Sequence, residues 1–388
     1  MNIIVIGNGF DLAHGLPTKY TDFLEFVKVL NNVLEERNKD YDCIDMCNIN
    51  VQIKTLIKEN ITQQIEQWKS LLNDNFWIEY FLQNDMHGKE NWIDFESEIS
   101  DLIQSIHMDM YEKRSLTSMY EEIDGIFINE FLENYLWKDN VDRKLNIYKD
   151  IKDKLYDDLN RLIKALEIYL YQYVNKINCE KKLPDIQEII AEKEICKILS
   201  FNYTNTIERV YIDKSNMDID FIHGKANKDL EIEKNNMVLG IDEFLPAEKQ
   251  NINVEFVEFK KFYQRIYKET GCKYKNWVDE IKSEHSLYVK KIAKANFLYD
   301  EAMICKNCKK HNLYIFGHSL DVTDGDILRD LILNDNVSTT IFYHNKENMG
   351  KQITNLVKVV GENELIRRTG GSTRTIKFKL QKKFNIDF

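Results

Sequence analysis

Short apolar runs rich in β-branched residues recur at wide intervals along the chain. The first covers residues 3–6 and is followed at once by Gly7 and Gly9. A continuous apolar run of this length, bounded by turn residues, is typical of a strand buried on both faces of a parallel sheet. Further runs of this kind cover residues 195–200, 219–222, 237–239, 313–316, 339–343 and 375–380. Together they predict the strands of an α/β core.

A long charged region with helical periodicity separates the first two runs. Its clearest segment is YDDLNRLIKALEIYLYQYV, where apolar residues return at steps of three and four. Together with Leu155, which directly precedes the segment, these residues are Leu159, Leu162, Ile163, Leu166, Tyr169, Leu170 and Tyr173. The spacing predicts one apolar face on an amphipathic helix, with the tyrosines packed in a core or an interface. A second helical block is predicted in VEFVEFKKFYQRIYKETG and WVDEIKSEHSLYVKKIAKANFLYDEAMI.

The economical architecture is a Rossmann-type parallel sheet core interrupted by two large helical insertions. We expect the core to combine residues 1–21, 193–244 and 311–388, and the insertions to span residues 22–192 and 245–310. Helices beyond these insertions are needed as well, because a parallel sheet must be covered on both faces. Amphipathic helices and aromatic stripes of this length are also compatible with a homo-oligomer.

Composition narrows the class of protein. The chain has 388 residues, a formal net charge of −11 and 30% charged residues. The charge argues against broad nucleic-acid binding, which needs a basic surface. No apolar stretch approaches the roughly 20 residues that span a bilayer, and no signal peptide is recognisable at the start. We therefore expect a cytoplasmic protein without a membrane partner.

The cysteines do not predict disulfides or a metal centre. There are seven, an odd number, and they are scattered along the chain, which is typical of a reducing compartment. Cys305, Cys308 and His311 form the one grouping that resembles a ligand set. A single Cys-x-x-Cys pair supplies half of a tetrahedral zinc site, so we expect a surface loop and no metal.

The glycine-rich turn after the first strand predicts a ligand-binding loop. Glycines let the backbone turn sharply and approach a ligand closely, and a following helix offers its free N–H groups to an anion. The usual dinucleotide fingerprint has a third glycine three residues after the second, where this chain has Leu12. Gly15 arrives later. A conventional dehydrogenase is therefore disfavoured.

Polar residues follow three further strands in the same way. Asn202 follows the strand in ILSFNYTNT, His223 follows the one in DIDFIHGKA, and Gly317 opens the turn in NLYIFGHSLDVTDGDIL. Ligands of open α/β sheets bind at the carboxyl ends of the strands. Four strand ends with polar tips are more informative than one glycine loop, and they predict a shared site.

The order of these motifs resembles the sirtuin fold, and more closely the AbiH family of bacterial abortive-infection proteins. The opening GNGFDLAHGLPTKYTDF, then NWIDFE, FNYT, HG and GHSLDVTDGDIL carry the AbiH resemblance. It reaches from residue 1 to about residue 330, with little of the match in the helical insertions. It implies a role against bacteriophages, with a phage or host protein as a conceivable trigger.

The sirtuin-like resemblance implies that NAD is bound as a substrate and cleaved at its nicotinamide–ribose bond. His223 would be the general base, since an unperturbed pKa near 6.5 suits that task at neutral pH. Asn202 would hold the ribose or the attacking water, and Asp11 would steady the developing ribose cation. The nucleotide itself would contact Gly7, Asn8, Gly9, Phe10, Gly317, Ser319, Leu320 and Asp324.

Structural alternatives stand beside several of these roles. Asp11 and Asp324 each precede a helical run and are candidates for helix N-caps. Asn202 has a turn residue as its alternative, and His223 a buried core histidine. His14 faces either the ligand or solvent. From the NWIDFE segment, Asp94 is better suited to a cap, whereas Glu96 is a further candidate for the site.

We therefore expect an abortive-infection effector that hydrolyses NAD to nicotinamide and ADP-ribose. Two alternatives remain open. The same site could cleave another nucleotide or a nucleic acid, because a carboxylate such as Asp11 is unfavourable beside a pyrophosphate. The chain could also be a non-enzymatic sensor that binds a nucleotide in its core and a phage protein through the helical insertions.

Overall fold

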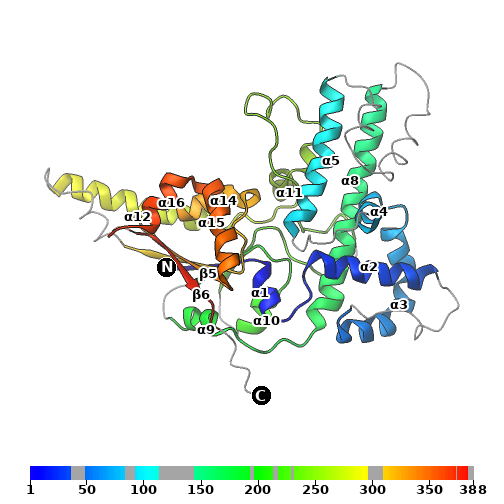
Figure 1. Cartoon of the computed structure of the whole chain (residues 1–388), viewed down its shortest axis with the longest axis horizontal. Coiled ribbons are helices and arrows are strands. Elements are labelled where there is room, and N and C mark those ends of the chain that lie inside the picture. The colour runs from blue at the N-terminus through cyan, green and yellow to red at the C-terminus, as the bar shows by residue number, and fades with distance from the viewer. Residues whose placement is uncertain are drawn as a thin grey trace. The chain divides into compact units, whose positions relative to one another are not determined.

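The computed structural model describes residues 1–35, 49–83, 92–112, 144–192, 196–212, 217–228, 231–295, 309–372 and 374–382. It consists of two compact units whose segments alternate along the chain (Figure 1). The sheet unit comprises Met1–Leu16, Asn178–Lys225 and Glu269–Phe388. The helical unit comprises Pro17–Ile177 and Ala226–Lys268.

The sheet unit is built on one six-stranded sheet. Its strands are β1 (Asn2–Ile6), β2 (Cys196–Ser200), β3 (Asp218–Phe221), β4 (His311–Phe316), β5 (Val337–Tyr343) and β6 (Ile376–Leu380). Every neighbouring pair is parallel. Six of the seven predicted strands are thereby confirmed, together with the α/β class.

The predicted strand at residues 237–239 is wrong. These residues are buried, but they belong to the helical unit and join no sheet. Side chains bind their backbone instead: Gln264 accepts from the N–H of Leu239 at 3.1 Å and donates to its carbonyl at 3.0 Å. The apolar run reflects burial alone, and periodicity cannot distinguish it from a strand.

The strand order determines where a ligand site belongs. Along the sheet the order is β3-β2-β1-β4-β5-β6, which is that of the doubly wound Rossmann fold. The chain moves outward in one direction from β1 to β3 and in the other from β4 to β6. The order therefore reverses between β1 and β4, and ligands of open α/β sheets bind outside the carboxyl ends of the strands at such a point.

Alternation along the strands separates two apolar layers. In β1, Ile3 and Val5 point to one face, whereas Ile4 and Ile6 point to the other, as the two-residue period of a strand requires. The first layer is covered by α12 (Tyr274–Ala295), α14 (Gly325–Ile332), α15 (Lys346–Val360) and α16 (Glu362–Thr369). The second is covered by α9 (Pro184–Ala191) and α10 (Thr206–Tyr211).

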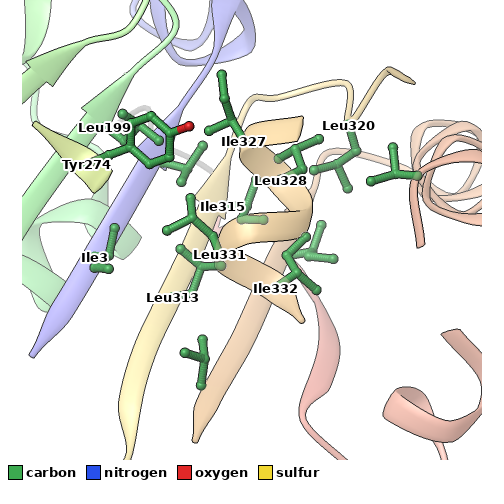
Figure 2. Packing of buried hydrophobic residues seen from close by; sticks show 14 of the residues in the cluster. Ile3, Leu199, Tyr274, Leu313, Ile315, Leu320, Ile327, Leu328, Leu331 and Ile332 are labelled. Atoms are coloured by element: carbon green, nitrogen blue, oxygen red, sulfur yellow. The ribbon is translucent and has the colours of Figure 1, made fainter. Parts of the chain in front are cut away.

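Helix α14 illustrates how a helix packs on the first apolar layer of the sheet. Figure 2 shows Ile327 and Leu331 of this helix beside Ile315 and Leu313 of β4, in the same cluster as Leu328 and Ile332. All of these side chains are at most 1% exposed. Full burial of each contributes about 1.5–3 kcal/mol relative to exposure, so this face fixes the helix on the sheet.

The boundaries of the units differ from the expected insertions in two places. Helices α9 and α12 lie in the sheet unit, although residues 22–192 and 245–310 were expected to form insertions. The reason is packing: Ile186 and Ile189 of α9 join the second layer, and Trp277 and Ile281 of α12 join the first. These two helices therefore cover the faces of the sheet.

The helical unit contains most of the predicted amphipathic segments. Its elements are α2 (Tyr20–Glu35), α3 (Val51–Leu72), α4 (Phe76–Gln83), α5 (Trp92–Glu112), α8 (Lys144–Ile168), the π-turn η3 (Tyr169–Tyr173), the 3₁₀ turns η4 (Val174–Lys176) and η5 (Val257–Phe259), and α11 (Lys261–Tyr267). Every apolar residue predicted for the face of α8 and η3 is buried. The rings of Tyr169 and Tyr173 both pack against Phe26, which confirms their role in packing. Among the described helices, none has the length and apolar character that crossing a bilayer requires.

Three glycines allow the turns after β1 and β4 to approach closely. A Cβ on Gly9 would lie 2.8 Å from the Cα of Gly317, and one on Gly7 would lie 2.8 Å from the carbonyl oxygen of Gly317. Gly317 itself has a φ of +67°, and its Cβ would lie 2.3 Å from the backbone nitrogen of Phe10. The turns after β1 and β4, where the strand order reverses, therefore pack backbone against backbone. Only glycine permits so close an approach at these positions.

We expect Gly317→Ala to destabilise the protein by about 2–5 kcal/mol, because the methyl group meets backbone atoms and the left-handed conformation is unfavourable for alanine. Gly350→Ala is the matched control. It lies inside α15 with nothing within 4 Å of the added Cβ, so alanine should stabilise by about 0.5–1 kcal/mol. Urea unfolding midpoints measure both changes, and equal midpoints for the two variants would contradict this packing of backbone against backbone.

Candidate functional site

The carboxyl ends of four strands bring polar side chains to one edge of the sheet. Asp11 follows β1 in helix α1 (Asn8–Ala13), Asn202 follows β2, His223 follows β3 and His318 follows β4. Ser200 pairs with Phe221 in the sheet register, so Asn202 and His223 each come two residues after the last paired position. The three predicted catalytic residues therefore all lie in the sheet unit at this edge.

Asp11 is a buried carboxylate that is held by a chain of hydroxyl groups. It is 1% exposed, and its Oδ2 accepts a hydrogen bond of 2.7 Å from Thr204, whose hydroxyl in turn accepts from Thr206 at 3.0 Å. Burial raises the pKa of Asp11 from 3.8 to about 6, an effect that these threonines and the charge of Arg209 partly offset. Gly7 is the N-cap of α1, so the N-cap alternative for Asp11 is wrong.

Asn202 presents a buried amide that makes no hydrogen bond within the part of the chain that the structure describes. The residue is 5% exposed, and neither its Oδ1 nor its Nδ2 bonds to a described residue. The same is true of the second carboxylate oxygen of Asp11. The amide is near enough to lower the pKa of Asp11. Leaving a buried polar atom unpaired costs about 1–3 kcal/mol, so this pair is well suited to a polar ligand.

His223 forms a pair with a carboxylate. Its Nε2 lies 3.1 Å from Oδ1 of Asp324, and both residues are buried. Asp324 ends the 3₁₀ turn η6 (Val322–Asp324) and occupies the N-cap position of α14, but its side chain makes no capping hydrogen bond. The carboxylate of Asp324 is therefore better explained by its contact with His223 than by helix capping.

A second histidine lies on the other oxygen of the same carboxylate. Nε2 of His318 is 3.5 Å from Oδ2 of Asp324, and its Nδ1 accepts a hydrogen bond of 2.9 Å from the N–H of Leu320. The ring of Phe201 lies 4.3 Å from the ring of His318 and 5.4 Å from that of His223, between centroids. The histidines and Asp324 therefore form a buried His–Asp–His row beside an aromatic ring.

This arrangement can support general base chemistry. An ionised Asp324 accepts hydrogen bonds only, so a neutral His223 must carry its proton on Nε2 and its lone pair on Nδ1. A carboxylate that orients imidazole in this way also stabilises the imidazolium that forms when Nδ1 takes a proton. Asp11 adds a negative charge at neighbouring strand ends at any pH well above 6, which favours a positively charged reacting group.

The backbone of the glycine loop is hydrogen-bonded within the protein. The N–H of Gly7 donates to Phe316 at 3.1 Å, that of Gly9 to Gly317 at 2.8 Å, and that of Phe10 to Gly7 at 2.8 Å. These three donors are thus directed at the protein's own carbonyls. Asn8 is half-buried at the start of α1. A nucleotide-binding role for this loop stays a prediction.

Three other residues of the predicted nucleotide site make contacts that belong to the fold. Phe10 is fully buried and packs in the second apolar layer, and Leu320 is fully buried in the first. Figure 2 shows Leu320 among the core side chains. Ser319 is exposed, and its carbonyl accepts from Asn355 of α15 at 3.0 Å. Their contacts to a nucleotide also stay a prediction.

The secondary candidates His14 and Glu96 have polar partners within their own units. His14 bonds to the carbonyl of Phe10 and to the hydroxyl of Tyr211, at 2.7 and 3.0 Å. Glu96 is in the helical unit and forms a buried ion pair of 2.8 Å with Lys261. The side chain of Asp94 lies outside the described residues.

The described residues include no group of three or more side chains arranged to hold a metal. Of the three residues that resembled a ligand set, Cys305 and Cys308 also lie outside the described residues. His311 begins β4 and lies 3.0 Å from a carboxylate oxygen of Glu284.

Sequence reasoning overlooked His318, Thr204 and Thr206. Each follows a strand end that was already singled out, in GHSL and in FNYTNT. The available signal was position: His318 comes two residues after the end of β4, as His223 comes two residues after the end of β3. Thr204 lies in the bend after β2 and Thr206 begins α10, and this local geometry brings their hydroxyls within 3.0 Å of each other.

Comparison with known proteins gave one family. A family model described as bacteriophage abortive infection AbiH matches residues 3–344. The match includes strands β1 to β5 and all of the candidate site residues. A search of the curated proteins gave no match, and neither did a search of the solved structures.

The raised pKa of Asp11 predicts how stability depends on pH. Between 3.8 and about 6, the folded state keeps the Asp11 proton while the unfolded state releases it, so this carboxyl makes stability fall as pH rises. A shift of about two pH units corresponds to about 3 kcal/mol.

Asp11→Asn keeps an acceptor for Thr204 but cannot ionise. We expect the free energy of unfolding of the variant, minus that of the wild type, to increase by up to about 3 kcal/mol between about pH 4 and about pH 7. Above pH 7 this difference should be constant. Denaturant unfolding across this range measures the difference. A constant difference would show that Asp11 ionises in the folded state as it does in water.

Proposed function

The chain belongs to the AbiH family, whose function is bacteriophage abortive infection, and we propose that it acts there as an NAD glycohydrolase. Loss of NAD stalls the metabolism of an infected cell, which is a direct route to abortive infection. NAD is a substrate in this proposal, and its nicotinamide–ribose bond is the one that breaks.

One observation carries the proposal: a histidine–carboxylate pair lies at the same sheet edge as a buried carboxylate and a buried amide, and the amide makes no hydrogen bond to any described residue. The pair is His223 with Asp324, and the other two groups are Asp11 and Asn202. Cleavage of an N-glycosidic bond requires a base, a negative charge and a hydrogen-bonding group for the sugar. The strand order supports NAD, because dinucleotides bind doubly wound sheets at the point where the order reverses.

In the proposed reaction, the bond between C1′ of the ribose and the nicotinamide nitrogen breaks, and the nitrogen keeps the electron pair. Nicotinamide leaves as a neutral ring, while positive charge develops on C1′. The oxygen of a water molecule bonds to C1′, and the proton it loses goes to Nδ1 of His223. The products are nicotinamide, ADP-ribose and a proton.

Each residue has a separate role in this scheme. The Asp11 carboxylate is ionised at neutral pH and stabilises the cation at C1′ through its charge, which is effective because the group is buried. The Asn202 amide holds a ribose hydroxyl or the attacking water. Asp324 orients His223. Positioned general bases typically contribute about 10²–10⁴-fold to a rate.

The direct test follows nicotinamide release from NAD by chromatography. We expect turnover by the wild type and a loss of at least about 100-fold in His223→Ala and Asn202→Ala, because the base and the sugar contact are removed. His344→Ala is the matched control, since His344 is exposed at the end of β5 and should keep full activity. Because an effector of abortive infection acts during infection, NAD is also measured in phage-infected cells that carry each variant.

Turnover that persists at the wild-type level in both site variants would dismiss the assignment. The same holds if infected cells keep their NAD while the wild-type protein still protects the culture. In either case the site residues serve another purpose.

A second candidate is hydrolysis of another nucleotide at the same site. It is favoured by the glycine loop, whose N–H groups at Gly7, Gly9 and Phe10 already bond to the protein's own carbonyls, in contrast to a loop whose N–H groups point at a pyrophosphate. Nicotinamide mononucleotide, purine nucleotides and phage RNA should be assayed beside NAD. If a mononucleotide is cleaved in preference to NAD, with the same dependence on His223, this candidate replaces the first. Binding without any product would indicate a sensor.

A further inference from the structure

We infer that His318 is a positioning residue for the base: it holds Asp324 so that this carboxylate fixes the proton of His223 on Nε2. The inference rests on the proposed function in one respect, that His223 acts as a base at this site. The two contacts of Asp324, with His318 and with His223, are themselves a statement about geometry. They can be tested whether or not NAD is the substrate.

The protonation of His318 follows from its surroundings. Its Nδ1 accepts the N–H of Leu320 at 2.9 Å, so in the neutral ring the proton must be on Nε2. That nitrogen faces Oδ2 of Asp324 at 3.5 Å, while Oδ1 lies 3.1 Å from Nε2 of His223. One carboxylate thus has a histidine on each oxygen: a hydrogen bond joins it to His223, and a longer polar contact joins it to His318.

The turn that carries His318 is anchored at each of its four residues. The carbonyl of Gly317 accepts from Gly9 at 2.8 Å, that of His318 from Gln352 at 3.2 Å, and that of Ser319 from Asn355 at 3.0 Å. The side chain of Leu320 is fully buried in the first apolar layer. Segments from α1 and α15 therefore hold this turn from two directions.

Backbone strain in the turn is a second, independent indication that the orientation of His318 matters. Leu320 has a φ of +61°, a left-handed conformation that costs a non-glycine residue about 1–3 kcal/mol. In this conformation its N–H bonds to Nδ1 of His318. Strain of this kind persists only where the surroundings over-determine it, and it gathers at functional sites. Here it sets the protonation of the histidine next to the reactive pair.

Burial makes the row effective. The His318 side chain is 4% exposed and that of His223 is 7% exposed, and Phe201 contacts both rings. Little water competes for the oxygens of Asp324, and hydrogen bonds to a carboxylate strengthen in such surroundings. When His223 takes a proton, the carboxylate stays in place and no further proton transfer is needed.

The decisive experiment compares two variants of one residue. His318→Phe keeps an aromatic ring against Phe201 but removes the donor to Asp324. His318→Gln places an amide N–H near the position of Nε2 and so restores the donor. Circular dichroism and unfolding midpoints establish that each variant is folded. Nitrogen-15 NMR of the histidine rings then reports which nitrogen carries the proton.

In the wild type, both His318 and His223 should carry the proton on Nε2. In His318→Phe, the spectrum of His223 should change to a mixture of the two protonation forms, and kcat should fall about 10–100-fold with KM changed by less than about twofold. His318→Gln should restore the Nε2 form and most of kcat. A purely structural role predicts lower stability but no such selective change in the NMR spectrum.

Proton placement on Nδ1 of His318 in the wild type, or a His223 spectrum that is the same in His318→Phe, would overturn the inference. The failure of the NAD proposal looks different. If the rings behave as expected and NAD is not cleaved, the row of side chains is supported and the substrate assignment fails. If NAD is cleaved and His318→Phe retains the wild-type kcat, the NAD proposal stands and the role of His318 is overturned.

Discussion

The close contact between the turns after β1 and β4 is the constraint on which the rest of the sheet unit depends. Gly7 and Gly9 pack directly on Gly317, and the N–H of Gly9 bonds to the carbonyl of Gly317. This contact joins the two central strands at the point where the sheet order reverses. It also brings α1, which carries Asp11, next to the turn that carries His318. Any side chain between them would separate the two halves of the site.

The sheet edge combines groups that are individually unfavourable. A carboxylate with a raised pKa, a buried amide without a hydrogen-bond partner among the described residues and a leucine in a left-handed conformation each cost free energy. The apolar layers on both faces of the sheet supply the stability that makes these costs tolerable. Rigid strands position the site, and the unfavourable groups are concentrated where a ligand can compensate them.

The glycines illustrate how one motif can serve two purposes. A glycine turn after a buried first strand suggests a cradle for phosphate, yet the N–H groups of Gly7, Gly9 and Phe10 bond to carbonyls of the protein. Here the absence of side chains serves close packing of backbone on backbone. In the function we propose, the chemistry rests instead on the side chains of Asp11, Asn202, His223 and Asp324, and a conventional dinucleotide fingerprint is not required.

The sequence by itself determined the strands, the amphipathic helices and the positions of Asp11, Asn202 and His223 after strand ends, because alternation, helical period and turn residues are local properties. Local patterns could not show that residues 237–239 bond to Gln264 rather than to a strand, nor that α9 and α12 cover the sheet. They also could not show that Asp324 is the hydrogen-bond partner of His223, because the two residues are 101 positions apart along the chain. Only the tertiary structure decided that this carboxylate lies between two histidines, because such a contact depends on how distant strand ends pack together.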